Sequence, residues 1–166
     1  MNTDKAVTRN DAVAALAELR VAIRLIRSLQ RSALPRWSDG MIDWFYDAGT
    51  SDDPIVYDDA ELESYRLART HLQNSIRINP NDPTAHALLG NAFAEIDGDA
   101  ERQLDCYCKS LALDPDDDGI VVARLGWYIS NGQLNDALVD LLHLESLDSD
   151  HASPMRTHYE NAVNGG

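Results

Sequence analysis

Apolar side chains recur at spacings of three and four residues near the start of the chain: Leu16, Leu19, Ile23 and Ile26. Positions with this spacing share one face of an α-helix. Asn10 or Asp11 can cap the N-terminus of such a helix. Pro35 ends it, because the residue before a proline avoids helical backbone angles. The pattern therefore predicts a helix from about Asp11 to Ser32.

A second pattern repeats along the chain. Helical stretches end at Ile78-Asn79-Pro80 and again at Leu113-Asp114-Pro115, and the two prolines are 35 residues apart. Periods of this length are typical of proteins that stack similar pairs of helices. One helix pair cannot bury its apolar face alone, so the pairs must pack on one another.

The stretch between the two prolines resembles the tetratricopeptide repeat family, whose period is about 34 residues. The residues that carry the resemblance are Leu89-Gly90, Phe93, the turn Gly98-Asp99, Tyr107, Ser110 and Pro115. Gln103 departs from the pattern, because the family prefers alanine there, and one extra residue lies near Ile96-Asp97. A second unit matches at Leu125, Tyr128, Gly132, Ala137, Leu141 and Leu144, and a half unit upstream at Ala68, Leu72 and Ser75.

This resemblance implies an all-α fold, a short right-handed superhelix of tetratricopeptide-like antiparallel helix pairs with capping helices at both ends. Residues 1–33 are expected to form a helix on the first repeat, and residues 34–58 an aromatic and acidic loop. The repeats then span residues 59–151, as a half unit 59–82 and two units, 83–117 and 118–151. Residues 152–166 are expected to form a capping helix and tail, with Pro154 at the first helical position.

In this family the first helix of each pair lines a concave groove that binds a partner peptide or helix. The resemblance places the following residues in the groove: Thr84, Ala87, Asn91, Ala94, Val122, Arg124 and Ile129. Such a groove is small and weakly polar, and it suits a peptide with apolar anchors.

Two further segments are candidate binding elements. Aromatic residues in the predicted loop are typical anchors at protein interfaces, although they can equally plug the end of the stack: Trp37, Trp44, Phe45 and Tyr46. Arginines spaced four, three and four residues apart form a basic stripe on the first helix: Arg20, Arg24, Arg27 and Arg31. The stripe suits an acidic partner, or it is simply a solvated face.

The charge of the chain narrows the classes of partner. The chain has 28 acidic and 14 basic residues and a formal net charge of −14. Residues 1–80 carry 10 basic and 12 acidic side chains, whereas residues 81–166 carry 4 and 16. Such a field repels phosphate backbones and argues against nucleic acid. The acidic half suits a partner with basic segments.

No segment has the pattern of a membrane span or a secretory signal. Apolar runs stay shorter than about 18 residues, and the N-terminus lacks a basic start followed by an apolar stretch. We therefore expect a cytoplasmic protein.

The sequence contains no recognisable catalytic or metal-binding motif. Cys106 and Cys108 are separated by one residue, which is wrong for a CxxC redox motif. The acidic run that ends at Gly119 resembles the start of a calcium loop, but Leu125 stands where the bidentate glutamate is required. His143, His151 and His158 match no catalytic pattern, although they could converge near the C-terminal turn. We expect no catalytic residues, no metal and no cofactor.

These observations predict a protein-interaction module, either an adaptor, an assembly factor or a chaperone. The alternative is a self-assembling structural protein that forms homo-oligomers. A third hypothesis is an enzyme whose active site is assembled in space, because catalytic groups need not be adjacent in sequence.

Overall fold

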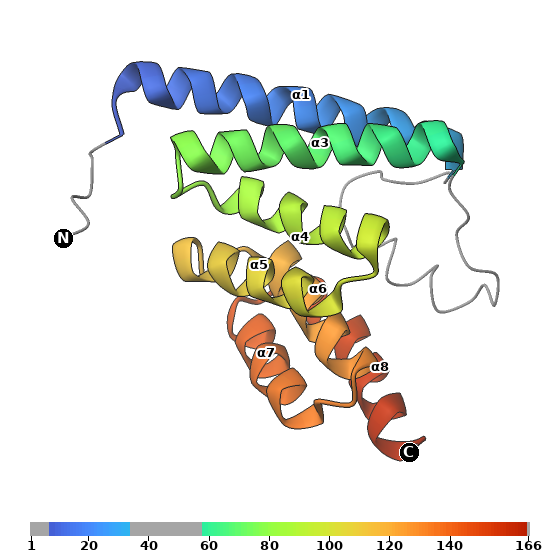
Figure 1. Ribbon diagram of the computed structural model, residues 1–166. Coiled ribbons are helices and arrows are strands. Elements are labelled where there is room, and N and C mark those ends of the chain that lie inside the picture. The colour runs from blue at the N-terminus through green and yellow to red at the C-terminus, as the bar shows by residue number, and fades with distance from the viewer. Residues whose placement is uncertain (1–6, 34–57, 166) are drawn as a thin grey trace.

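The computed structural model describes residues 7–33 and 58–165, and for residues 28–33 it describes the backbone alone. This part of the chain is all-helical, as predicted, and contains no strand (Figure 1). Its seven helices are α1 (Arg9–Ala33), α3 (Asp59–Ile78), α4 (Pro83–Asp97), α5 (Ala100–Leu113), α6 (Asp118–Ser130), α7 (Leu134–Ser146) and α8 (Ala152–Asn164). None of them combines the length and apolar character needed to cross a membrane.

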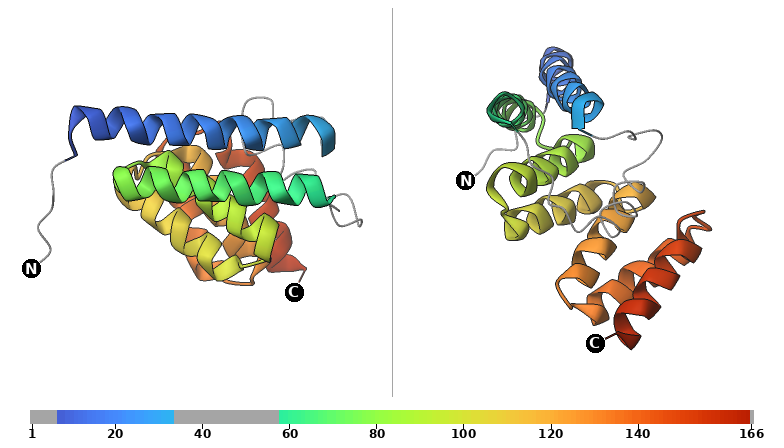
Figure 2. Two further views of the ribbon diagram at one scale, coloured as in Figure 1. Left: turned by 45° about the horizontal axis from the view of Figure 1, so that its top comes forward. Right: turned by 90° about the vertical axis from the view of Figure 1, so that its right-hand side faces the viewer.

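The helices are stacked in chain order. α1 and α3 lie side by side and run in opposite directions at one end of the stack, and α7 and α8 lie at the other end (Figures 1 and 2). Each helix packs against the next one in this order, and α8 also contacts α6. Neighbours in sequence are therefore neighbours in space.

The first helix is longer than predicted, and its cap is a different residue. The Thr8 hydroxyl accepts a hydrogen bond from the backbone N–H of Asp11 at 3.1 Å, and the Asp11 carboxylate accepts one from the backbone N–H of Thr8 at 3.0 Å. Each side chain satisfies a backbone donor of the other residue, as in a capping box. The prediction of Asn10 or Asp11 as the cap was wrong, since Asp11 lies inside the first turn.

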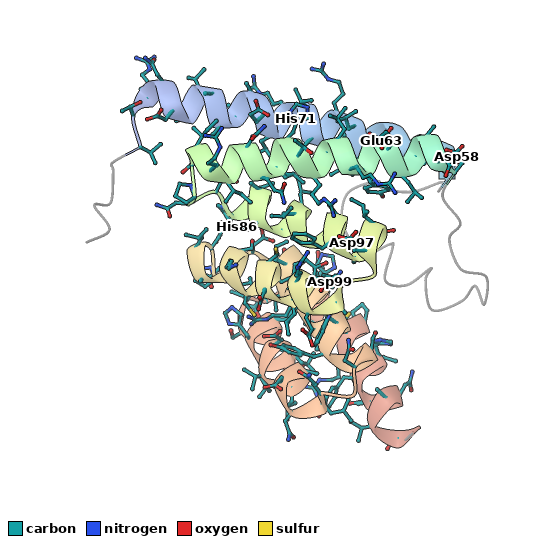
Figure 3. All side chains as sticks on the ribbon, viewed as in Figure 1. Asp58, Glu63, His71, His86, Asp97 and Asp99 are labelled. Carbon is teal, nitrogen blue, oxygen red and sulfur yellow. The ribbon has the colours of Figure 1, made fainter. Side chains whose placement is uncertain are left out.

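Aspartates begin the four helices that follow. Asp58 lies at the start of α3 (Figure 3) and forms a capping box with Glu61. Asp82, Asp99 and Asp117 each accept a hydrogen bond from a backbone N–H three residues on. These caps satisfy backbone donors that have no partner within the helix.

Two glycines make the turns inside the helix pairs, as predicted. Gly98 has φ 61° and Gly132 has φ 69°, values that glycine adopts without the strain a side chain would impose. At the other end of the molecule, Pro154 is the third residue of α8 and not the first, because α8 begins at Ala152. The first turn still tolerates proline, since its backbone N–H groups lack helical acceptors.

The core repeats with the helix pairs. Among the buried residues of α3, α5 and α7, three positions are equivalent from one helix to the next. The first set is Ala68, Gln103 and Ala137, the second is Leu72, Tyr107 and Leu141, and the third is Ser75, Ser110 and Leu144. The two serines also donate hydrogen bonds to the preceding helix, from Ser75 to the Ala15 carbonyl and from Ser110 to the Pro83 carbonyl, both at 2.9 Å. Buried hydroxyl groups are thus paired, as they must be to avoid a desolvation cost.

Gly90 sets the distance between α4 and α5. A Cβ atom added to Gly90 would lie 3.0 Å from the Cβ of Cys106 and 3.0 Å from the carbonyl oxygen of Gln103. A side chain at this position would therefore push the two helices apart.

Candidate protein-interaction surfaces

Three of the residues predicted to line a groove are buried instead. Ala87, Val122 and Ile129 belong to one core cluster with Tyr107 and Leu125. Their assignment to an accessible groove is corrected by the structure. The physical reason is that the apolar side chains of α4 and α6 are needed to fill the interior between the helix pairs.

The remaining positions on α4 differ in exposure. Thr84 is exposed and Ala94 is half-buried. Asn91 is half-buried, and its side-chain oxygen accepts a hydrogen bond from the Tyr107 hydroxyl at 2.5 Å. The Tyr107 hydroxyl accepts another from Gln103 at 3.0 Å. Gln103, which departs from the family pattern, thus satisfies a tyrosine whose pKa is raised by burial.

Arg124, the last of the predicted groove residues, is held by α7. Its Nε and Nη2 atoms donate to the two carboxylate oxygens of Asp140 at 2.9 and 2.6 Å. Asp140 is only 2% exposed. The two hydrogen bonds raise the pKa of the Arg124 guanidinium, and the pair joins α6 to α7 in a bidentate geometry.

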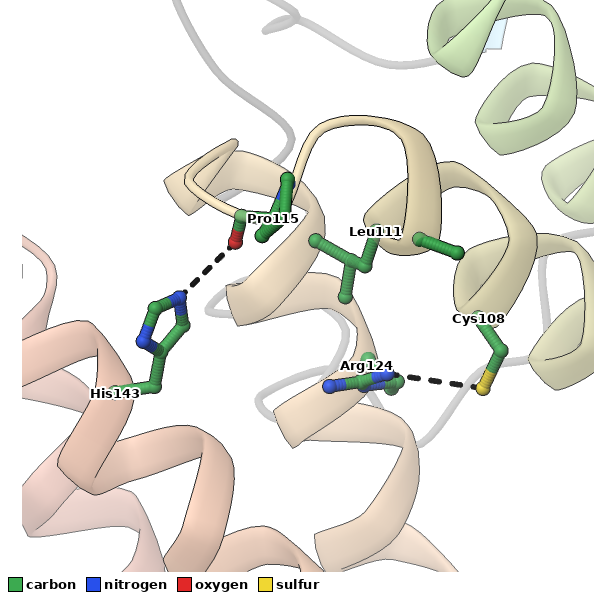
Figure 4. Close-up of a pocket in the computed structure, with 6 residues that line it drawn as sticks. Cys108, Leu111, Pro115, Arg124 and His143 are labelled. Atoms are coloured by element: carbon green, nitrogen blue, oxygen red, sulfur yellow. Dashed lines mark hydrogen bonds between the residues drawn. The ribbon is translucent and has the colours of Figure 1, made fainter. Parts of the chain in front are cut away.

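A cleft of about 320 Å³ opens beside Arg124, between α5, α6 and α7 (Figure 4). It is lined by Cys108, Leu111, Ala112, Pro115, Arg124 and His143. His143 donates from Nε2 to the Pro115 carbonyl at 3.0 Å, and Arg124 Nη1 lies 3.7 Å from the Cys108 sulfur. The cleft therefore combines an apolar wall with one guanidinium edge.

The two cysteines lie in different environments. Cys106 is buried, and burial raises the pKa of its thiol to about 11. Cys108 is half-exposed at the cleft. Both are free thiols.

The basic stripe is exposed along the outer side of α1. The side chains of Arg20, Arg24 and Arg27 face solvent, and none forms an ion pair with a carboxylate in the part of the chain that the structure describes. Arg31 belongs to α1, but its side chain is outside the described set. The aromatic residues Trp37, Trp44, Phe45 and Tyr46 also lie outside the described residues.

The histidines near the C-terminal turn are all among the described residues: His143, His151 and His158. Within residues 7–33 and 58–165, no group of three or more His, Cys, Asp or Glu side chains is placed to hold a metal ion. His143 is bound to Pro115, whereas His71 donates to Glu18 at 2.6 Å.

The cleft and the buried carboxylate of Asp140 were not predicted from the sequence. No sequence pattern predicts the cleft, because its residues come from three helices. The sequence does indicate that Asp140 is buried, because it lies between Ala137 and Leu141 on the apolar face of α7. A charged residue on such a face requires a partner.

No family model matches the chain. Similar proteins include two from Homo sapiens, RANBP2-like and GRIP domain-containing protein 8 and RANBP2-like and GRIP domain-containing protein 5/6. Each is 31% identical over 62 residues, which make up 37% of this chain and 4% of the relative. The chain thus matches only a small part of the length of these relatives.

Proposed function

We propose that this chain is a protein-interaction module, acting in the cytoplasm as an adaptor, assembly factor or chaperone. In this proposal, tetratricopeptide-type helix pairs form a short right-handed superhelix that binds a peptide or helix of another protein. The chain's role is binding and not catalysis.

The repeated core supports this architecture. The second helices of three successive pairs, α3, α5 and α7, have buried residues at equivalent positions of the repeat. Ser75 and Ser110 occupy one of these positions, and each donates a hydrogen bond to a carbonyl of the preceding helix. Small residues such as Ala68, Ala137 and Ser110 occupy two of the three equivalent positions, where they let paired helices approach closely.

The cleft between α5, α6 and α7 carries the proposal. Its volume of about 320 Å³ lies within the range of clefts that hold small ligands or side chains. Leu111, Ala112 and Pro115 offer an apolar wall, and Arg124 remains half-exposed at the edge. This chemistry suits a peptide with an apolar anchor next to a carboxylate or carbonyl group that accepts from the guanidinium.

A cleft-filling variant tests the proposal. Ala112 is exposed on the cleft wall, so Ala112→Trp fills the space with little change to the core. Ala60→Trp, at an exposed alanine of α3, is the matched control. Each form is used to capture proteins from the native cytoplasm, and circular dichroism verifies that each is folded.

We expect a partner to be retained by the intact chain and by Ala60→Trp, and to fall at least about tenfold with Ala112→Trp, as for the loss of an interface anchor. Equal capture by all three forms would move the site away from the cleft. Capture by none would remove the support for an interaction module.

A further inference from the structure

The outer face of α1 presents a continuous row of exposed side chains. At about 100° per residue, Val13, Leu16, Arg20, Arg24 and Arg27 fall within a sector of about 80°. Val13 is 63% exposed and Leu16 is 42% exposed. We call these five residues the α1 outer face. It is apolar in its first part and basic in its second.

The positive charge on this face has no counterpart within the described residues. Asp11 and Glu18 are the two carboxylates of α1, and each is engaged elsewhere. Asp11 accepts from Thr8, and Glu18 accepts from His71 on the side that packs against α3. Three guanidinium groups therefore project from one end of the stack in a molecule whose net charge is −14.

The other end of the stack presents a complementary surface. α7 buries Ala137, Leu141 and Leu144 on one side and exposes Leu138, Val139 and Leu142 on the other, with Val139 at 65% exposure. We call the three exposed residues the α7 outer face. Exposed aspartates lie on or next to α7: Asp136 is in its first turn, the Asp116 carboxylate is 3.7 Å from His143, and Asp148 and Asp150 follow the end of the helix.

We propose that the α1 outer face of one copy binds the α7 outer face of a second copy, so that the chain assembles head to tail. Val13 and Leu16 then cover exposed apolar surface of α7, and the three arginines face the acidic surroundings. A self-complementary contact between two α1 helices is disfavoured, because it would place arginines opposite arginines.

Two properties of the molecule favour a second copy as the occupant. Residues 81–166 carry 4 basic and 16 acidic side chains, so the complementary charge for the arginines is present in every copy. In addition, stacked helix pairs need covered ends, and each end here leaves apolar side chains exposed. A head-to-tail contact covers both ends with one interface.

The inference goes beyond the proposed function, since a chain can bind another protein through the cleft without binding itself. Two variants of the full chain block one face each. Arg20→Glu with Arg24→Glu blocks the α1 outer face, and Val139→Asp with Leu142→Asp blocks the α7 outer face. All four positions are exposed, so the fold is expected to persist.

Matched controls alter similar residues elsewhere. Arg66→Glu with Arg102→Glu makes the same change in net charge at exposed arginines of α3 and α5. Leu67→Asp places a carboxylate at an exposed leucine of α3. Circular dichroism and thermal unfolding check the fold of every form, and sedimentation velocity over a range of concentrations measures its mass.

We expect the intact chain and both controls to associate further as concentration rises, and each blocked variant alone to remain a monomer. An equimolar mixture of the two blocked variants is expected to form dimers and stop there, because it offers one intact face of each kind. Only a head-to-tail contact gives this result.

A monomeric intact chain at every concentration would overturn the inference. So would a mixture of blocked variants that stays monomeric while the intact chain assembles, because the contact would then use other surfaces. Either result leaves the cleft test unaffected, since that test measures capture of a different protein.

Discussion

At the residue scale, Asp140 shows how one buried charge connects two helices. Its carboxylate is buried on α7 and receives two hydrogen bonds from Arg124 on α6. A buried ion pair adds little net stability over an apolar pair, but removal of one partner leaves the other charge buried and uncompensated.

We predict that Asp140→Asn lowers the free energy of unfolding by about 2 kcal/mol, because the half-exposed Arg124 guanidinium loses its charge-assisted hydrogen bonds to the carboxylate. Urea unfolding followed by circular dichroism measures the change. Asp136→Asn, at an exposed position of the same helix, is the control and is expected to alter stability by less than about 0.5 kcal/mol. Equal effects of the two variants would contradict a structural role for the pair.

At the scale of elements, α1 is fixed to α3 by both apolar and polar contacts. Ala15, Leu19, Ala22 and Ile26 are buried, and Glu18 accepts a hydrogen bond from His71 at 2.6 Å. That bond lowers the pKa of Glu18, partly offset by burial, while Asn74 and Arg77 of α3 act in the same direction as His71.

A lowered pKa means that the ionised Glu18 favours the folded state. The contribution is complete above the ordinary pKa of a glutamate and is lost as the pH falls through the lower pKa of the folded state. We predict that Glu18→Gln removes part of the loss of stability on acidification through this window. Thermal unfolding of both forms from neutral to acidic pH measures it.

Glu63→Gln is the control for this experiment, since Glu63 is an exposed carboxylate of α3 whose ion pair with Arg66 is long, at 3.4 Å. Its pH profile is expected to follow that of the intact chain. If Glu18→Gln gave the same profile as Glu63→Gln, the contact with His71 would have no part in the pH dependence of folding.

At the scale of the whole molecule, charge opposes folding. The net charge is −14, and most of the excess lies in residues 81–166. Like charges held in a compact fold repel one another, and salt screens them over a Debye length of about 8 Å at 0.15 M.

We predict that sodium chloride raises the midpoint of thermal unfolding by a few degrees between about 0.01 and 0.5 M, because screening weakens this repulsion. The variant Asp105→Asn with Asp114→Asn removes two exposed acidic charges. It is expected to unfold at a higher temperature at low salt and to respond less to salt. A midpoint that falls with salt in the intact chain would show that attractive ion pairs outweigh the repulsion.

The sequence by itself determined the helices and much of the repeated core. Apolar spacing and turn glycines act within a few residues, so the all-α fold and the turns at Gly98 and Gly132 followed from local pattern. Positions on the second helices, such as Ala137 and Leu141, were also predicted, because they match the repeat pattern that the chain resembles.

Only the tertiary structure decided what lies at the surface. Ala87, Val122 and Ile129 were predicted in an open groove, but packing between helix pairs buries them. The cleft and the Arg124–Asp140 pair bring together residues of different helices. The spacing of residues along the sequence does not indicate how far apart residues of different helices lie. The opposed outer faces of α1 and α7 likewise exist because stacking places those helices at the two ends of the molecule (Figure 1). Local interactions set the helices, whereas the packing of side chains between helices set the sites.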